Sequence, residues 1–422
     1  YHPVLIEPVS TLVHGGVRAA IAWKWYGVSD RDCRFFSPMC SEETRRVARA
    51  PVTSKWRWLT YGSAADVEEV AARYRGLWEA ERSLGLAADV LLCMELRDAY
   101  FLWRASGVAT IYFPAIIFMQ DEAMNDFGAE VYLQQFDALG RHDVLLPQPE
   151  PGPGGAGAAG GLAPAAIVAQ SPYIAESIYY HTHRRVPAVR PLALYVGARY
   201  APNSTDPRAA RVMVMCARTR LLMSQGCRAL FREARRALPL ASRLRLFLPI
   251  GDGDVVHGLS FEDVAKFDAS VLVPWNIAVT TFVEMYAMHM PLFVPDELWL
   301  ARLWPKQMTS YGRAHPGLHR EFRGSAPRGA RHPTPYPSLD RVAEDFRAML
   351  YWASHYAHLH NLPGVRPFAS IPALLLLLHS GQGGLTEASE AMRAEAGRAA
   401  REVVPFWAGL LGRLARGGAG KT

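Results

Sequence analysis

Residues 271–296 read VLVPWNIAVTTFVEMYAMHMPLFVPD. The apolar run at 269–273 predicts a buried strand, residues 280–289 predict a helix, and 291–295 predict a second buried strand after a short turn. Strands that are apolar throughout and alternate with helices are typical of a parallel sheet covered on both faces. This stretch therefore predicts an α/β fold.

The same alternation extends along most of the chain and defines two successive series. Residues 186–207, which separate the two series, are rich in proline and lack periodicity, so we place the domain boundary there. In the first series we expect strands at 4–6, 89–95, 108–113 and 166–172 and helices at 19–26, 64–84, 99–104, 130–139 and 173–181. In the second we expect strands at 212–216 and 244–249 and helices at 225–237 and 260–266, in addition to the elements of 269–295.

Three segments depart from this alternation. Residues 147–166 (PQPEPGPGGAGAAGGLAPAA) are almost entirely Pro, Gly and Ala, which predicts a flexible insertion in the first domain. Residues 306–340 are loop-like, and from Leu339 onward we expect only helices. The sequence thus predicts an N-terminal α/β domain at 1–195, a second at 206–340 and C-terminal helices at 341–422.

Composition excludes several classes of protein. The 422 residues carry 46 Lys+Arg and 39 Asp+Glu, and 50% of them are hydrophobic, which is a globular balance rather than that of a disordered chain. The pI is near 9.2, but the basic residues are scattered among acids without long like-charge runs. We therefore expect no nucleic-acid partner.

The cysteines bear on the compartment. None forms a CxxC pair or has a His partner at zinc spacing, so no metal or redox motif is predicted. Cys33 and Cys40 could bridge in an oxidising compartment, and Asn203-Ser204-Thr205 is a glycosylation sequon. Both features favour the secretory lumen of the ER or Golgi over the cytoplasm, whereas buried free thiols fit either. The three cysteines expected to be free are Cys93, Cys216 and Cys227.

No apolar stretch reaches the roughly 18 residues needed to span a bilayer. The chain starts at Tyr1 rather than Met, so a signal or anchor could precede it. Residues 385–416 have an apolar stripe and an Arg-rich opposite face, which predicts an amphipathic helix. That helix either packs on the protein's own surface or makes a peripheral membrane contact.

The start of the helix at 280–289 has the chemistry of an anion site. Thr280 and Thr281 supply hydroxyls in a first turn whose backbone N–H groups and dipole favour an anion such as a diphosphate. Glu284 lies one turn further along, where a carboxylate can accept hydrogen bonds from ribose hydroxyls.

These residues resemble the donor-binding domain of glycosyltransferases of the GT-B superfamily, and the similar pattern spans about 206–380. Glu284, Ala287-Met288, Pro291 and Val294 match the superfamily's Glu-Ala-Met-like helix and the Gly-x-Pro-Val-Val-like strand that follows it. The resemblance implies two Rossmann-like domains that face an interdomain cleft, with terminal helices that partly cross back to the first. Several members pair two glutamates eight positions apart. Here Asn276 replaces the first, which leaves retaining or inverting stereochemistry open.

Further residues resemble those that the family has at corresponding places in its two domains. Arg218 follows the predicted strand at 212–216, where such enzymes bring a cation to the donor phosphates, and a guanidinium suits that role. His257 precedes a short helix, near where the base is recognised, and Ser260 with Asp263 predicts a capping box. The motif His14-Gly15-Gly16-Val17-Arg18 resembles the glycine-rich first loop that faces the acceptor, with Gly15, Gly16 and Arg18 as loop residues.

Two residues are candidates for the catalytic base. His14 could deprotonate an acceptor hydroxyl because histidine titrates near neutral pH. Glu95 follows an apolar strand and would lie at the sheet's carboxyl edge, so it is the rival.

The sequence thus predicts a glycosyltransferase that moves a sugar from a nucleoside-diphosphate donor, a UDP- or GDP-sugar, to a hydroxyl acceptor. The acceptor could be a glycan, a protein or a small molecule. The chain has no Asp-x-Asp or HExxH motif, and Arg218 with the helix dipole could neutralise the leaving group, so we expect no metal and no other cofactor. The alternatives are a non-catalytic scaffold or interaction protein of GT-B architecture and a nucleotide-sugar epimerase.

Overall fold

The computed structural model describes residues 8, 10–11, 67–83, 89–94, 96–114, 122–145, 162–203, 210–216, 222–248, 259–274, 279–302, 346–356, 361–381 and 384–419. The chain divides into two compact units. Unit 1 comprises residues 1–191, 322–332 and 403–422, and unit 2 comprises residues 192–321 and 333–402. Each unit contains a parallel β-sheet, so the α/β class expected from the sequence is confirmed.

Unit 1 has a three-stranded parallel sheet in the order β1-β2-β3. The strands are β1 (Val90–Cys93), β2 (Ala109–Tyr112) and β3 (Ala165–Ile167). The helices are α5 (Val67–Ser83), α6 (Leu96–Ser106), α7 (Glu122–Gly140) and α8 (Pro172–Thr182). Of the N-terminal segment before α5, the structure describes Pro8, Ser10 and Thr11, which are helical.

The end of the expected insertion belongs to the core of unit 1. Trp103 on α6 is 1% exposed, and its Nε1 donates to the carbonyl of Ala163 at 2.8 Å. Ala165 and Ala166 are 0% exposed and lie in β3. The prediction of a flexible insertion is therefore wrong for 163–166, because these small residues fit a close-packed strand. Residues 146–161 lie outside the described residues.

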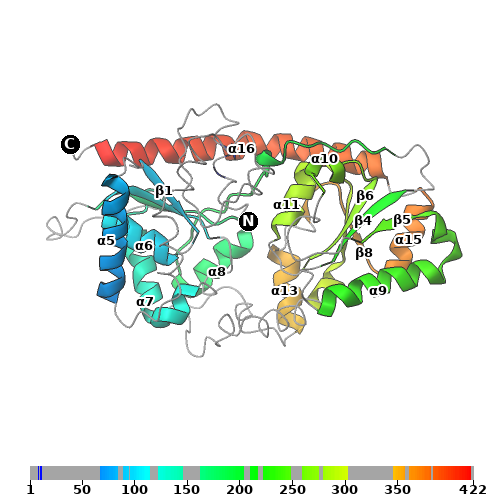
Figure 1. Ribbon diagram of the computed structural model, residues 1–422, viewed down its shortest axis with the longest axis horizontal. Coiled ribbons are helices and arrows are strands. Elements are labelled where there is room, and N and C mark those ends of the chain that lie inside the picture. The colour runs from blue at the N-terminus through cyan, green and yellow to red at the C-terminus, as the bar shows by residue number, and fades with distance from the viewer. Residues whose placement is uncertain are drawn as a thin grey trace. The chain divides into compact units, whose positions relative to one another are not determined.

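Unit 2 has a five-stranded parallel sheet in the order β5-β4-β6-β7-β8. The strands are β4 (Arg211–Cys216), β5 (Arg245–Phe247), β6 (Ala269–Val273), β7 (Leu292–Pro295) and β8 (Val365–Phe368). The helices include α9 (Leu222–Ala237), α10 (Phe261–Val264), α11 (Thr280–Ala287), α13 (Phe346–Tyr356) and α15 (Ile371–His379). Figure 1 shows α9 and α15 on one face of this sheet and α11 on the other.

Burial explains the order of these strands. Every residue of β6 and β7 is buried, whereas β5 at the edge exposes Arg245 and Phe247. Val212, Val271 and Phe293 from three adjacent strands are each 0% exposed and belong to one core with Phe231 of α9 and Leu375 of α15. The continuous apolar runs thus become central strands because helices cover both of their faces.

Strand β8 contradicts the expectation of an entirely helical chain after Leu339. It pairs in parallel with β7, with Leu292 opposite Val365. The strand has four residues and contains Pro367, so the sequence carries no strand periodicity there. Proline is tolerated in a sheet at an edge, where its missing N–H costs no ladder bond, and β8 ends the described sheet.

Helix α16 (Leu385–Ala419) belongs to both units, with residues up to 402 in unit 2 and later ones in unit 1. One mainly apolar stripe of the helix is buried in the protein, together with the carboxylate of Glu395, which pairs with Arg398 at 2.7 Å. The apolar residues of the stripe are Ala388, Met392, Ala399, Val403, Trp407, Leu410 and Leu414. Within the described ranges, no helix combines the length and the hydropathy that a membrane crossing requires.

Two cysteines differ in chemical state. Cys93 in β1 is a buried free thiol, as expected. Cys227 on α9 is disulfide-bonded, so the expectation that it is a free thiol is wrong.

Gly364 is required by the turn that leads into β8. Its φ is +84°, and a Cβ there would overlap the carbonyl oxygen of Ala388 and approach Met392 Cγ to 2.8 Å. We predict that Gly364→Ala lowers the free energy of unfolding by about 2–4 kcal/mol, because backbone strain and overlap add. Urea denaturation measures the loss.

Gly381→Ala is the matched control. Gly381 has φ +69° in the same unit, but a Cβ there would have no atom within 4 Å. It should cost only the backbone strain, about 1 kcal/mol. Equal losses in the two variants would contradict the role of the α16 contact.

Candidate functional site

The candidate site lies at the carboxyl edge of the unit 2 sheet, where the strand order changes direction. β5, which follows β4 in the chain, and β7, which follows β6, lie on opposite sides of the β4–β6 pair, so the strand order reverses there. In open α/β sheets, ligands bind at such a switch point. The last paired residues of the two strands are Cys216 and Val273, so both following segments leave the same edge.

Helix α11 begins shortly after β6 and lacks a side-chain cap. Its N-cap residue is Val279, which has extended backbone and no side-chain oxygen to accept from the first turn; its carbonyl accepts from the N–H of Phe282 at 3.0 Å. In the described part of the chain, α8, α10 and α15 instead start with serines whose hydroxyls accept from the third helical N–H. These serines are Ser171, Ser260 and Ser370. An uncapped helix start at a switch point leaves the first turn of α11 suited to an anion.

Glu284 lies one turn into α11 and is 1% exposed. The hydroxyl of Tyr195 donates a hydrogen bond of 2.9 Å to its Oε1. Tyr195 itself is 9% exposed and comes from the 3₁₀ helix η2 (Leu194–Val196). A buried carboxylate requires such donors, because an unpaired one costs several kcal/mol. Glu284 therefore fixes α11 to the segment that contains Tyr195.

The whole of residues 192–203, which we call the boundary strap, is attached to unit 2. The N–H of Tyr200 donates to the carbonyl of Met288 at 2.8 Å, and its hydroxyl donates to the carbonyl of Asp268 at 2.8 Å. The N–H of Ala201 donates to the carbonyl of Ala265 at 3.0 Å. The strap thus contacts the end of α11 and the turn before β6.

Sequence reasoning did not find Tyr195. It lies in the proline-rich range 186–207 that we interpreted as a domain boundary, and its partner Glu284 is 89 positions away. The one available signal was that a glutamate in an apolar helix requires a donor, which does not identify the donor.

The structure describes part of the predicted donor site. Thr280 starts α11, Thr281 in the first turn is half-buried, and Glu284 follows on the same helix. Residues three and four apart on a helix lie on one side, so Glu284 follows Thr280 and Thr281 along one face. The other predicted residues lie outside the described residues. These are His14, Gly15, Gly16, Arg18, Glu95, Arg218, His257 and Asn276.

The predicted capping box of α10 is confirmed. The N–H of Asp263 donates to Ser260 Oγ at 3.2 Å, and the N–H of Ser260 donates to Asp263 Oδ2 at 3.3 Å. The box fixes the start of the helix that follows His257 in sequence.

No group of three or more His, Cys, Asp and Glu side chains able to hold a metal ion occurs among the described residues. No protein-family model matches the chain, and no curated protein or solved structure is significantly similar to it.

The Tyr195–Glu284 bond yields a stability prediction. Tyr195→Phe removes the donor while the carboxylate stays buried, so we expect the free energy of unfolding to fall by about 1–3 kcal/mol. Urea denaturation gives this value directly.

Tyr286→Phe provides the comparison, because the Tyr286 hydroxyl donates to a neutral acceptor, the carbonyl of Pro363, at 2.8 Å. That substitution should cost about 0.5–1.5 kcal/mol. A loss at Tyr195 no larger than that at Tyr286 would show that the carboxylate does not depend on this donor.

His289 is a buried base in the turn after α11. It is 8% exposed, has φ +60°, and its Nδ1 has no hydrogen-bond partner among the described residues. Burial, together with the positive charges of Arg199 and Arg393, lowers its pKa to about 4. The folded protein therefore keeps this imidazole neutral.

We predict that His289 destabilises unit 2 as the pH falls. The folded pKa lies below the unfolded value of 6.5, so between pH 6.5 and about 4 the unfolded chain binds more protons and stability falls with pH. His289→Asn removes this proton, and asparagine tolerates positive φ. Between pH 7 and pH 4, the free energy of unfolding of the variant should fall by about 1–3 kcal/mol less than that of the original chain.

A residue of unit 1 changes the stability with pH in the opposite direction. Asp143 is 0% exposed, and burial raises its pKa to about 6, above the usual value of 3.8, so its effect favours the folded state at low pH. The measurement is therefore the difference between His289→Asn and the original chain in urea denaturation at each pH. Parallel curves for the two proteins would contradict the prediction.

Proposed function

We propose that the protein is a metal-independent glycosyltransferase of GT-B type, which moves a sugar from a nucleoside-diphosphate donor to a hydroxyl acceptor. The observation that carries the proposal is the carboxyl edge of the unit 2 sheet. There the switch point between β4 and β6 coincides with α11, whose N-cap is Val279. In an open parallel sheet this is the place for a nucleotide, with its phosphates at a helix start.

The diphosphate would be held without a metal. The N–H groups and hydroxyls of Thr280 and Thr281 would face its oxygens together with the positive end of the helix dipole. Arg218, two positions after the end of β4, would supply a forked guanidinium. These groups stabilise the negative charge that develops on the departing diphosphate, and this lowers the barrier to transfer.

The acceptor half of the reaction is assigned to unit 1. Two units that each contain a parallel sheet support the proposal of two Rossmann-like domains with the acceptor in the first. The base would be His14, in the loop with Gly15, Gly16 and Arg18, or Glu95, two positions after the end of β1. Either could take the proton of the attacking hydroxyl. The disulfide of Cys227 supports a lumenal location, where such bonds persist.

A non-catalytic scaffold is the second candidate, and one observation favours it. Glu284, the residue assigned to ribose, is 1% exposed and accepts a hydrogen bond from Tyr195. A carboxylate in that state already has a structural role. The two candidates differ in what they predict for nucleotide affinity in variants of this residue.

Nucleotide binding tests the proposal. We expect UDP or GDP to raise the melting temperature, with about 2.7 kcal/mol of stabilisation at a hundred times the dissociation constant. Arg218→Ala should weaken binding by about 1.5–3 kcal/mol, and Glu284→Ala by about 1–3 kcal/mol, because each removes hydrogen bonds that involve a charged group. Titration calorimetry measures both affinities.

Arg232→Ala is the control for Arg218, because Arg232 is an exposed arginine on α9. It should leave the affinity unchanged. If neither UDP, GDP nor their sugars shift the melting temperature at millimolar concentration, the scaffold is the better assignment. If UDP binds and Glu284→Ala alters stability alone, Glu284 is structural and the ribose is held elsewhere.

A further inference from the structure

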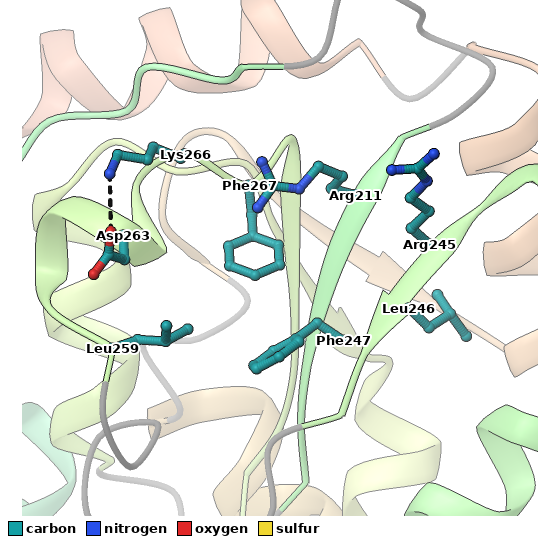
Figure 2. Close-up of a pocket in the computed structure, with 8 residues that line it drawn as sticks. All are labelled: Arg211, Arg245, Leu246, Phe247, Leu259, Asp263, Lys266 and Phe267. Carbon is teal, nitrogen blue, oxygen red and sulfur yellow. Dashed lines mark hydrogen bonds and ion pairs between the residues drawn. The ribbon is translucent and has the colours of Figure 1, made fainter.

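A pocket lies at the edge of the unit 2 sheet opposite the candidate site, where β4 and β5 begin (Figure 2). Its volume is about 320 Å³, which is at the lower end of the range for small-molecule sites. The side chains that define its chemistry are Arg211, Arg245, Phe247, Asp263, Lys266 and Phe267. Because it lies at the amino ends of the strands, it is separate from the switch point.

Two arginines stand side by side in this pocket. Arg211 is the first residue of β4 and Arg245 is the first of β5, and they are register partners in the parallel pair. Register partners project to the same face, where like charges repel each other. Among the described residues neither guanidinium forms an ion pair. The negative charge of Asp268 attracts Arg211, but one carboxylate does not offset two guanidinium groups, so the pair leaves an excess positive charge that an anion would relieve.

The carboxylates near the arginines are already engaged. Asp263 Oδ1 accepts from Lys266 Nζ at 2.8 Å, so these two charges offset each other. Asp268 Oδ2 accepts from the backbone N–H of Arg211 at 2.6 Å, rather than from its guanidinium. The excess charge of the pocket therefore comes from the two arginines.

Two aromatic rings lie beside this charge. The guanidinium carbon of Arg211 lies 4.9 Å from the centroid of the Phe267 ring, which holds it in a cation–π contact. Phe247, two positions after Arg245 on the same face of β5, has its ring centroid 5.4 Å from that of Phe267. Phe247 is 40% exposed, whereas Phe267 is 5% exposed. Figure 2 shows Arg211 next to Phe267, with the Phe247 ring nearby.

We propose that this pocket binds a small organic anion in which a flat ring is attached to a phosphate. The phosphate would lie between the guanidinium groups of Arg211 and Arg245, which can each donate two N–H groups to its oxygens. The ring would stack on the exposed face of Phe247. Each half of the ligand thus has its own partner: one compensates the arginine pair and the other covers an aromatic ring on an edge strand.

Phenyl phosphate is the probe, and inorganic phosphate and phenol are its two halves. Titration calorimetry on the full chain should show phenyl phosphate binding at least about tenfold more tightly than either half. Arg245→Gln should weaken the binding of phenyl phosphate by about tenfold or more. Phe247→Leu should leave the affinity for inorganic phosphate unchanged and reduce the preference for phenyl phosphate to less than about threefold.

Arg243→Gln is the matched control, because Arg243 is an exposed arginine two positions before Arg245 in the 3₁₀ helix Pro239–Arg243. It should bind phenyl phosphate as the original chain does. Equal affinity for phenyl phosphate and phosphate, or unchanged binding in Arg245→Gln, would overturn the proposal. A loss in Arg243→Gln as large as that in Arg245→Gln would do so too, because it would indicate non-specific charge attraction.

A ligand-free measurement supports the same inference. If the two arginines repel each other, Arg245→Gln should not lower the melting temperature without ligand, and the original chain should gain more stability from added sodium chloride than this variant. A lower melting temperature in folded Arg245→Gln would mean that Arg245 is already compensated, and would also overturn the proposal. Because phenyl phosphate lacks a nucleoside, these results are independent of UDP or GDP binding at the carboxyl edge.

Discussion

The parallel pairing of β4 with β6 is the constraint on which the rest of unit 2 depends. Five register pairs, from Val212 opposite Ala269 to Cys216 opposite Val273, align two strands that are buried on both faces. This register determines which residues meet at each end of the strands. At one end it makes the switch point next to α11. At the other it leaves Arg211 beside β5, where Arg245 is its partner.

A second constraint acts on α11 and connects stability with the proposed chemistry. The boundary strap holds the helix through Glu284 and through the carbonyl of Met288. The same helix has a first turn that no N-cap side chain serves. The strap therefore fixes the helix at Glu284 and Met288, while no side chain of the N-cap residue bonds to its first turn. A fixed helix with an open start suits anion binding, because little reorganisation is needed when the ligand arrives.

Local sequence patterns predicted the secondary-structure elements whose formation depends on residues close in the chain. They did not predict contacts between residues that are far apart in the chain. The predicted strand at 269–273 is β6, because a continuous apolar stretch is stable as a strand whose two faces are both covered by helices. Strand β8 was not predicted, because it contains Pro367 and lies at the edge of the described sheet, so its sequence has no strand periodicity. The predicted site included Glu284 but not Tyr195, because tertiary packing sets the pairing of these two residues. The Arg211–Arg245 pair was likewise invisible, since neighbouring strands and their register are not encoded locally.

Because of helix α16, the order of segments along the chain does not match the division of the protein into compact units. Residues up to 402 complete unit 2, whereas Trp407, 1% exposed and edge-on to Phe113 at 5.4 Å, belongs to unit 1. Unit 1 is thus built from segments that lie before and after unit 2 in the sequence. During synthesis on the ribosome, its core lacks this tryptophan until the five strands of the unit 2 sheet have already been made.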